Sequence, residues 1–328
     1  MEGKKSASSS PCGIGVLSIQ GLKFLATAMV LYLLVFFGLT HLRVMGKQAI
    51  YRTNDYYQWK GGVAYAKFKE WDEGDRYDAV VVGSSHAYRG YDPRVFDARG
   101  YRMFNLGSSA QTPLSTYAIL EEYLTKDRTS LVIIDLYENS FDQEGLESVS
   151  DLTQNVGSDR AAFRLAASFR DLRGVNMFTL RMMNKNGPSM WADPDYKGAG
   201  FAIKADSTRK GVKYDAGRKL RLNARQKAYF VKCLDLCEDR GTRVVLCTHF
   251  APHQSDHARH SAFTTFVDSV LATRDPSENL RWFDFSYDHD LDDHAHFCDH
   301  NHLNEAGARI FNERLVDSLV TGGFLPKH

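Results

Sequence analysis

The chain of 328 residues carries 41 basic and 40 acidic side chains, which gives it a formal net charge of +1. A chain this close to neutrality lacks the overall positive charge that attracts nucleic acid, so we expect no nucleic-acid partner. Its length allows one large domain with a buried core, and its 5 cysteines are too sparse for a disulfide scaffold.

An uncharged apolar run near the N-terminus extends from Phe24 to Leu39. With Lys23 and His41 able to reach toward the interface at its ends, the run approaches the roughly 20 residues that a bilayer span requires. It does not show the short apolar core and small-residue site of a cleaved signal peptide. We therefore expect a retained transmembrane helix, and a buried core helix is the alternative.

The composition divides the chain into a cytoplasmic tail at 1–21, a transmembrane anchor at 22–42, a membrane-proximal linker at 43–75 and a main domain at 76–328. Basic residues are balanced on the two sides of the apolar run, so charge does not decide its orientation. A short N-terminal tail ordinarily stays in the cytoplasm. This default predicts a single-pass membrane protein whose main domain is extracytoplasmic.

Short β-branched apolar runs alternate with helical patterns along the main domain. The alternation predicts right-handed βαβ units, and so an α/β fold with helices on both faces of a five-stranded parallel sheet. The expected strands lie at 77–82, 102–106, 130–135, 242–247 and 280–285, and the expected helices begin at Asp92-Pro93 or lie at 114–124, 222–240, 261–273 and 305–320. Ligands of such sheets bind beyond the carboxyl ends of the strands.

The block from about 139 to 220 breaks this alternation. It is polar, contains Gly-Pro and Gly-Ala-Gly, and has helical patterns near 159–170 and 176–183. We interpret it as an insertion beside the binding edge of the sheet, either a lid or a docking surface.

Two polar fragments fall at places where chemistry is expected. Ser85 follows the first strand, where its hydroxyl would lie at the ligand-binding edge near free backbone N–H groups. Asp299 and His302 precede the last helix, with Asn304 as its expected N-cap. At this spacing the carboxylate can meet one imidazole nitrogen and leave the other facing a nucleophile. An ordinary turn and a surface histidine are the alternatives for the isolated fragments.

Together the fragments resemble the SGNH/GDSL hydrolases over roughly residues 76–320. The resemblance rests on the Gly-x-Ser block after the first strand, on Asn105-Leu106-Gly107 after the second, and on Asp-x-x-His-Leu before the last helix. It implies a flavodoxin-like three-layer sandwich. The triad that it implies is Ser85, His302 and Asp299, and the oxyanion hole that it implies is formed by the N–H groups of Ser85 and Gly107.

The chain departs from the family pattern at two places. The usual aspartate before the nucleophile is Ser84 here, and the third block, Gly-x-Asn-Asp, is not recognisable. Only Asn139 or Glu138 stands where the oxyanion asparagine of that block would be. His86, next to the nucleophile, is expected to line the substrate pocket and not to act as the base.

The N-terminal span and the Gly-Ser-Ser block resemble the membrane-anchored acyl-transfer branch of this family, such as the D-alanyl transfer proteins of teichoic-acid modification and the SGNH proteins of polysaccharide O-acetylation. The resemblance implies a serine O-acyltransferase or esterase with a surface polysaccharide or other glycan as acceptor. It also implies a membrane-bound O-acyltransferase as a candidate partner. We expect no organic cofactor.

Two alternatives from other classes stay open. Residues 288–300 are rich in His and Asp and include Cys298, all of them metal-ligating types, so a metal-dependent hydrolase is one alternative. Their spacing matches no regular ligand pattern, which favours a polar active-site loop without a metal. A non-catalytic glycan-binding or assembly protein with the same fold is the other alternative.

Overall fold

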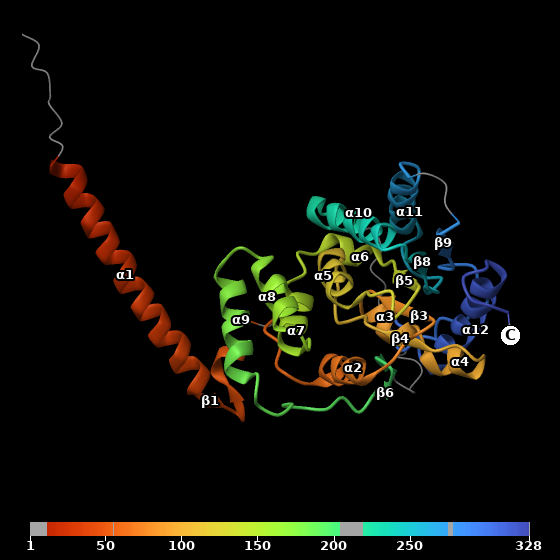
Figure 1. Cartoon of the computed structure of the whole chain (residues 1–328), viewed down its shortest axis with the longest axis horizontal. Coiled ribbons are helices and arrows are strands. Elements are labelled where there is room, and N and C mark those ends of the chain that lie inside the picture. Colours follow the sequence, from red (N-terminus) through yellow and green to blue (C-terminus); the bar gives the residue numbers. More distant parts are fainter. Residues whose placement is uncertain (1–11, 55, 204–218, 275–277, 328) are drawn as a thin grey trace, which may run out of the picture. The chain divides into compact units, whose positions relative to one another are not determined.

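The computed structural model describes residues 12–54, 56–203, 219–274 and 278–327. The chain forms two compact units, and the division between them falls between Tyr57 and Gln58. Figure 1 shows the helices and strands of both units. The predicted boundaries of tail, anchor, linker and main domain stay predictions, and residues 1–11 of the tail lie outside the described residues.

The first unit is dominated by one long helix. Helix α1 (Cys12–His41) is followed by a short hairpin of β1 (Arg43–Val44) and β2 (Lys47–Gln48) and by the 3₁₀ turn η1 (Ala49–Arg52). The stretch Ser18–His41 is 24 residues long, and its most apolar window of 18 residues has a mean hydropathy of 2.2. Such a helix spans about 36 Å, more than the roughly 30 Å hydrocarbon core of a bilayer. The prediction of an apolar N-terminal helix long enough to cross a membrane is confirmed.

A five-stranded parallel sheet forms the centre of the second unit. Its strands are β3 (Ala79–Val82), β4 (Met103–Asn105), β5 (Leu131–Asp135), β8 (Arg243–Thr248) and β9 (Leu280–Asp284). Their spatial order, β4-β3-β5-β8-β9, is the flavodoxin-like order of a doubly wound sheet. The α/β fold and all five predicted strands are confirmed.

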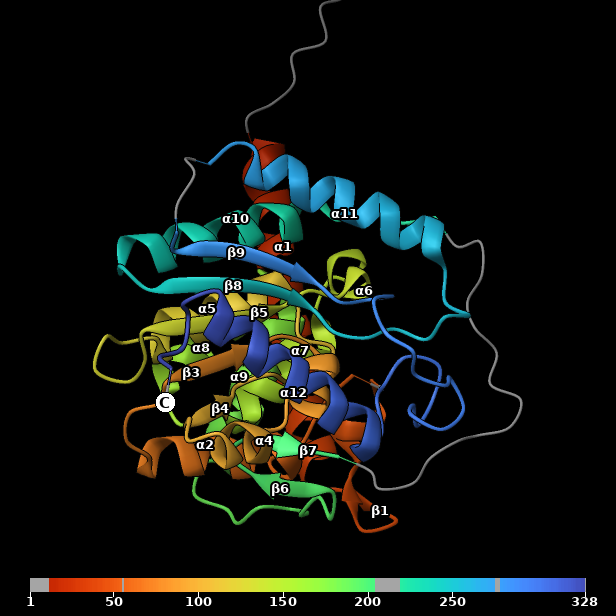
Figure 2. The same cartoon turned by 90° about the vertical axis from the view of Figure 1, so that its right-hand side faces the viewer.

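Helices cover both faces of the sheet. Helix α12 lies on one face and α5 on the other (Figure 2), and the buried face of α12 contributes Phe311, Leu315 and Leu319 to the core beneath β3. The helices in chain order are α2 (Gly62–Glu73), α3 (Ser85–Gly90), α4 (Pro93–Ala98), α5 (Pro113–Tyr123), α6 (Glu138–Asp142), α7 (Leu146–Asn155), α8 (Asp159–Ala167), α9 (Leu172–Asn184), α10 (Ala224–Asp239), α11 (His257–Leu271) and α12 (Glu305–Thr321).

The segment that interrupts the alternation is mostly helical. It holds α6 to α9 and a small antiparallel pair, β6 (Tyr196–Gly198) and β7 (Phe201–Ala202). The Asn105 N–H donates to the Ala199 carbonyl at 2.9 Å, so this pair is fixed against the end of β4. Residues 204–218 of the predicted insertion lie outside the described residues.

A glycine allows the chain to turn sharply from β3 into α3. Gly83 has φ of 151°, and a Cβ at this position would lie 2.7 Å from the Cβ of Asp135 at the end of β5. Only glycine meets both conditions without strain. The turn therefore brings the first residue of α3 close against the carboxyl edge of the sheet.

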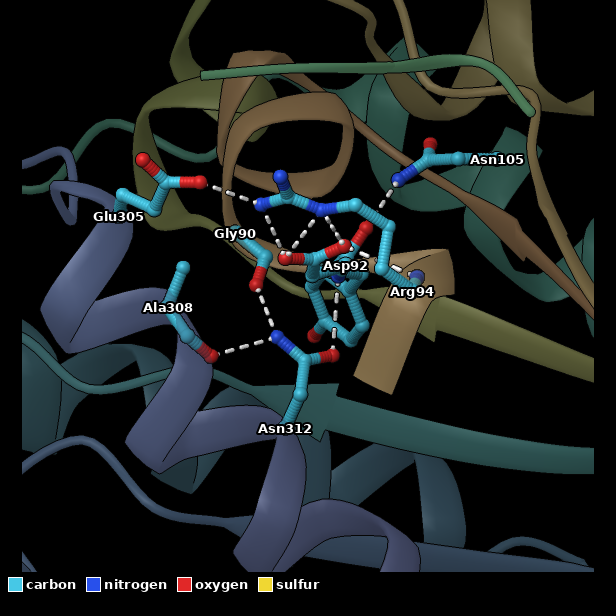
Figure 3. A network of polar contacts seen from close by, with 8 residues as sticks. Gly90, Asp92, Arg94, Asn105, Glu305, Ala308 and Asn312 are labelled. Atoms are coloured by element: carbon cyan, nitrogen blue, oxygen red, sulfur yellow. Dashed lines mark hydrogen bonds and ion pairs between the residues drawn. The ribbon is translucent and has the colours of Figure 1, made fainter. Parts of the chain in front are cut away.

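A buried polar network joins α12 to the end of α3 (Figure 3). The Asn312 amide donates to the carbonyls of Gly90 and Ala308, both at 2.7 Å, and its oxygen accepts the Asp92 N–H at 3.0 Å. Arg94 pairs with Asp92 beside this contact. Because α12 follows the Asp299–His302 loop, Asn312 fixes that loop relative to the helix that begins at Ser85.

We expect Asn312→Ala to lower the free energy of unfolding by about 2–4 kcal/mol, because it leaves buried donors and acceptors of the backbone without partners. Glu313→Ala, on the exposed face of the same helix, should change it by less than about 0.5 kcal/mol. Urea denaturation followed by circular dichroism measures both values. Equal effects of the two substitutions would show that the network does not hold α12.

Candidate active site

Ser85 is the first residue of α3. Ser84 caps this helix, with its hydroxyl accepting the His86 N–H at 3.3 Å. The first N–H groups of a helix have no intrahelical acceptor, so the Ser85 N–H points out of the helix end. The sequence folds locally to present a hydroxyl and a backbone N–H at the same edge of the sheet.

The structure brings Ser85, His302 and Asp299 together. His302 Nε2 lies 2.8 Å from Ser85 Oγ, and its Nδ1 lies 2.9 and 3.0 Å from the two carboxylate oxygens of Asp299. An ionised carboxylate only accepts, so Nδ1 carries the proton and Nε2 is free to accept the serine hydroxyl proton. The arrangement can therefore remove a proton from Ser85 as a nucleophile forms.

The surroundings of Asp299 keep it ionised. Burial alone raises the pKa of this carboxyl, but the hydrogen bond and charge of His302 and the N–H groups of Asn301 and His302 together lower the pKa well below its usual range. These two N–H groups donate to Asp299 Oδ1 at 3.0 and 2.9 Å. Asp299 is thus a fixed negative charge that orients the His302 ring.

The backbone of the β4–α5 loop approaches Ser85 through Gly107. A Cβ at Gly107 would lie 2.6 Å from the Cβ of Ala87 in α3, so glycine is required for this contact. The Gly107 N–H donates to Asn105 Oδ1 at 2.9 Å, and the Asn105 amide donates to the Ala87 carbonyl at 2.7 Å. Asn105 therefore connects this loop to the helix that begins at Ser85. The Gly107 N–H can donate to an oxyanion if it shares or gives up its hydrogen bond to Asn105 Oδ1.

Asn139, the other candidate oxyanion donor, lies on α6. Its amide donates to the Tyr137 hydroxyl, and Arg259 donates to its oxygen. Its side chain thus faces the cavity next to Ser85 with both polar atoms engaged.

Lys67 of α2 contacts the backbone of the Gly107 loop. Its side chain is fully buried, its amine donates to the Gly107 carbonyl, and it lies 5.3 Å from the ring centre of Tyr88. Burial lowers the pKa of Lys67 to about 7, against the opposing attraction of Asp151. No sequence pattern had singled out this lysine.

Lys67→Met is expected to lower kcat for an ester substrate about tenfold or more, since a displacement of the loop by 1 Å can cost far more than that. It should also reduce the free energy of unfolding by about 2 kcal/mol through the lost charge-assisted hydrogen bond. Lys69→Met, at an exposed position of the same helix, is the matched control. Unchanged kcat for Lys67→Met would contradict a role in positioning the loop.

A cavity of about 80 Å³ is lined by His86, the chain neighbour of Ser85, and by Asn301, the chain neighbour of His302, whereas Ser85, His302 and Asp299 themselves are not among its lining residues. Its lining side chains include aromatic rings and amide groups. The rings and amides are those of His86, Tyr137, Asn139, His249, His260, Tyr287, His300 and Asn301, and the charged side chains of Glu138, Asp256 and Arg259 also line the cavity. The Asn301 amide donates to the Tyr137 hydroxyl at 2.9 Å, which connects this wall to the loop of Asp299 and His302.

His86 forms the centre of a row of packed rings, in which it stacks on Tyr137 and His249 and meets His302 edge-on. Its ring centre lies 3.7 Å from that of Tyr137, 4.4 Å from that of His249 and 5.1 Å from that of His302. His86 thus lines the cavity and packs against the base, and its role in binding substrate stays a prediction. Burial keeps the pKa of His86 well below 6.5 and lowers that of His249 to about 4.

Acid should destabilise this row of rings. Because the folded pKa values are below the unfolded value, the neutral rings contribute stability above pH 6.5 that is lost as the pH falls toward about 4. Asp135, whose pKa burial raises to about 8, has the opposite effect. Denaturant unfolding of wild type and His249→Gln at several pH values separates the contribution of the His249 ring from that of Asp135. We expect the free energy of unfolding of the variant to fall less in acid than that of wild type. Parallel pH curves would contradict the burial of neutral rings.

The carboxylates of the His- and Asp-rich loop at 288–300 accept hydrogen bonds from backbone N–H groups of the loop itself and of a neighbouring segment. Asp292 accepts the N–H groups of His294 and Ala295, and Asp293 accepts those of His253 and Gln254. Within the described ranges, no group of three or more His, Cys, Asp or Glu side chains could hold a metal ion. The loop therefore gives no support to the metal-dependent alternative.

No family model and no curated protein matches the chain. Several solved structures are similar to it. A Bacteroides fragilis protein assigned as an acylhydrolase has 11% identity and a TM-score of 0.41, over 79% of this chain and 95% of its own. A Desulfitobacterium hafniense protein assigned to the G-D-S-L lipolytic family has 11% identity and a TM-score of 0.39, over 76% and 100%.

A family 2 carbohydrate esterase of Corynascus thermopiles has 9% identity and a TM-score of 0.41, over 76% of this chain and 67% of its own. Likenesses with TM-scores below 0.5 do not assign a reaction to this chain. The reaction has to be inferred from the side chains around Ser85.

Proposed function

We propose that this protein is a serine esterase or O-acyltransferase of the SGNH type, with Ser85 as nucleophile, His302 as general base and Asp299 as the residue that orients it. The observation that carries the proposal is the continuous hydrogen-bonded series from Ser85 Oγ through the His302 ring to the Asp299 carboxylate. Three residues from two distant parts of the chain meet at the carboxyl edge of a parallel sheet, where active sites of such folds lie.

In the first half of the reaction, Ser85 Oγ attacks an ester carbonyl while His302 Nε2 takes its proton. The ester bond then breaks, and His302 returns the proton to the departing alcohol. In the second half, an acceptor hydroxyl gives its proton to His302 and attacks the acyl-enzyme; the bond from the acyl carbon to Ser85 Oγ breaks, and His302 returns the proton to Ser85 Oγ. Water as acceptor makes the protein an esterase, and a glycan hydroxyl makes it an acyltransferase.

The developing oxyanion needs N–H donors at the end of α3. The Ser85 N–H is the best placed, because it heads the helix without an intrahelical acceptor. Two further donors can contribute. The Gly107 N–H would have to give up its present acceptor, Asn105 Oδ1, and the Asn139 amide would have to give up the Tyr137 hydroxyl.

A surface polysaccharide or related glycan is the acceptor that we propose. The cavity beside Ser85 combines the rings of Tyr137 and Tyr287 with the amides of Asn139 and Asn301, which suits a hydroxylated ligand better than a hydrocarbon chain. The spanning length of α1 supports a single-pass anchor. We place the catalytic unit outside the cytoplasm because a short N-terminal tail before a first span ordinarily stays inside. A membrane-bound O-acyltransferase would then be the partner that delivers the acyl group, and no organic cofactor is needed.

The test uses the full chain in detergent with p-nitrophenyl acetate, alone and with a series of oligosaccharides. We expect release of p-nitrophenolate in both cases and acetylated oligosaccharide, detected by mass spectrometry, with the matching acceptor. Binding of oligosaccharides without any turnover would favour the non-catalytic binding protein instead.

A further inference from the structure

Three side chains of the cavity wall each carry a buried polar atom that has no hydrogen-bond partner within the described residues. These atoms are His86 Nε2, His249 Nε2 and Asn301 Oδ1. His86 and His249 are only 6% and 3% exposed. Buried polar groups of folded proteins are normally satisfied, and a group left without a partner costs free energy. The cavity therefore lacks hydrogen-bond partners that a ligand can supply.

The neighbours of these atoms show that two of them are acceptors. His249 Nδ1 lies 2.6 Å from the Phe250 carbonyl oxygen, which only accepts, so Nδ1 carries the ring proton. Burial lowers the pKa of His249 to about 4, so the ring is neutral near pH 7 and its Nε2 can only accept. The Asn301 amide donates to the Tyr137 hydroxyl at 2.9 Å, which leaves the Asn301 oxygen as an acceptor. A matching ligand must bring hydrogen-bond donors.

The charged side chains of the cavity wall do not favour an anionic ligand. Arg259 donates to Asn139 Oδ1, and its guanidinium lies 3.9 and 3.7 Å from carboxylate oxygens of Glu138 and Asp142. The positive charge of Arg259 is thus already balanced within the protein. Asp256, a further residue of the wall, adds a negative charge. A carboxylate in the cavity would meet acceptors and negative charge, whereas a neutral hydroxyl can donate.

The size and position of the cavity suit a single sugar unit. A volume of about 80 Å³ holds several water-sized groups, since one such group takes roughly 10–15 Å³. His86 directly follows Ser85, and Asn301 directly precedes His302. The ring centre of His86 also lies 5.1 Å from that of His302. A ligand of the cavity is therefore bound by the chain neighbours of both the nucleophile and the base.

We propose that the cavity is a sugar subsite that selects a neutral sugar over an acidic one, with His249 Nε2 and Asn301 Oδ1 each accepting a hydrogen bond from a sugar hydroxyl. The neutral ring of His86 supplies the third polar atom, its Nε2. The proposal rests on the proposed function in one respect, which is that the bound sugar is the acceptor of the acyl group from Ser85. Binding of the sugar itself requires no turnover.

The test is saturation-transfer NMR on the full chain in nanodiscs, which detects weak binding without turnover. The probes are the methyl glycosides of glucose, galactose and mannose, and methyl glucuronide is their acidic counterpart. His249→Phe keeps a ring and removes the accepting nitrogen, and Asn301→Leu removes the amide at similar volume. His294→Phe and Asn186→Leu are the matched controls, because both residues are exposed and neither lines the cavity. Thermal unfolding of all four variants verifies that they are folded.

We expect at least one neutral glycoside to bind the wild type and both controls, and its affinity to fall about tenfold in His249→Phe and in Asn301→Leu, since each loses one hydrogen bond. Methyl glucuronide should bind more weakly than its neutral counterpart. Binding that neither substitution changes, no binding of any neutral glycoside, or a preference for the glucuronide would overturn the proposal. The expected binding pattern in a protein that forms no acyl-enzyme would support the sugar subsite and reject the catalytic function.

Discussion

Ser85→Ala is expected to reduce turnover of p-nitrophenyl acetate by at least about 10⁴-fold, because no other group can form the acyl-enzyme. The substitution removes one hydroxyl whose hydrogen-bond partner within the described residues is His302, so the unfolding midpoint should stay close to that of wild type. Steady-state kinetics and thermal unfolding of the two proteins measure these effects.

Ser269→Ala is the matched control for that substitution. Ser269 lies on the exposed side of α11, and its hydroxyl bonds only to the Phe266 carbonyl of its own helix. We expect its kcat to equal that of wild type. Turnover that survives in Ser85→Ala would mean that another group, or a different site, carries the reaction.

Asp299→Asn is expected to lower kcat by roughly 10³-fold while leaving Ser85 and His302 in place, because an amide cannot hold the imidazole in the tautomer that accepts the serine proton. The side chain of Asp299 is 37% exposed, so water can partly replace the lost interaction. Asp290→Asn, at an exposed position before the same loop, is the control and should not change kcat.

The pH dependence separates orientation from simple folding effects. The pKa of Asp299 is lowered in the folded state, so its pair with His302 contributes stability at all pH values above the unfolded pKa and loses it only as the pH falls below that value. Above about pH 8, where imidazoles are uncharged, wild type and Asp299→Asn should therefore differ by a constant free energy of unfolding, and this difference should shrink as the pH falls below about 4. A difference that still changes above about pH 8 would contradict an ionised Asp299.

The fold could be predicted from the sequence because a buried parallel strand has a distinctive pattern. Runs such as Ala79–Val82 and Leu131–Asp135 are continuous and apolar, and the intervening helices begin at recognisable caps. Asn304 caps α12 as expected, with its side chain accepting the Gly307 N–H at 3.0 Å. Local signals of this kind do not require knowledge of distant contacts.

The position of Ser85 just after a strand followed from the same reasoning, whereas its grouping with Asp299 and His302 was implied by the resemblance to the SGNH/GDSL hydrolases. His249 follows β8 directly, so the same rule could have found it. The sequence gives no comparable signal for Lys67, which reads as an ordinary charged residue of an amphipathic helix. Its burial under the Gly107 loop is decided by tertiary packing alone.

The hydrogen-bond partners of Asn105 and Asn312 could not be predicted from the sequence. Both side chains bond to backbone groups of α3, Asn105 over a separation of 18 residues to Ala87 and Asn312 over 222 residues to Gly90. Isolated amides in a sequence carry no information on such partners. They matter here because they hold the nucleophile helix, the Gly107 loop and α12 in one geometry.

The most direct test of the central claim is intact-protein and peptide mass spectrometry after a rapid acid quench of the full chain with p-nitrophenyl acetate. We predict one added acetyl group on the peptide that contains Ser85, absent from Ser85→Ala and present in Ser269→Ala. An acetyl group on another residue, or turnover by a protein in which a fluorophosphonate forms no stable phosphonyl adduct on Ser85, would contradict the assignment of Ser85 as the nucleophile.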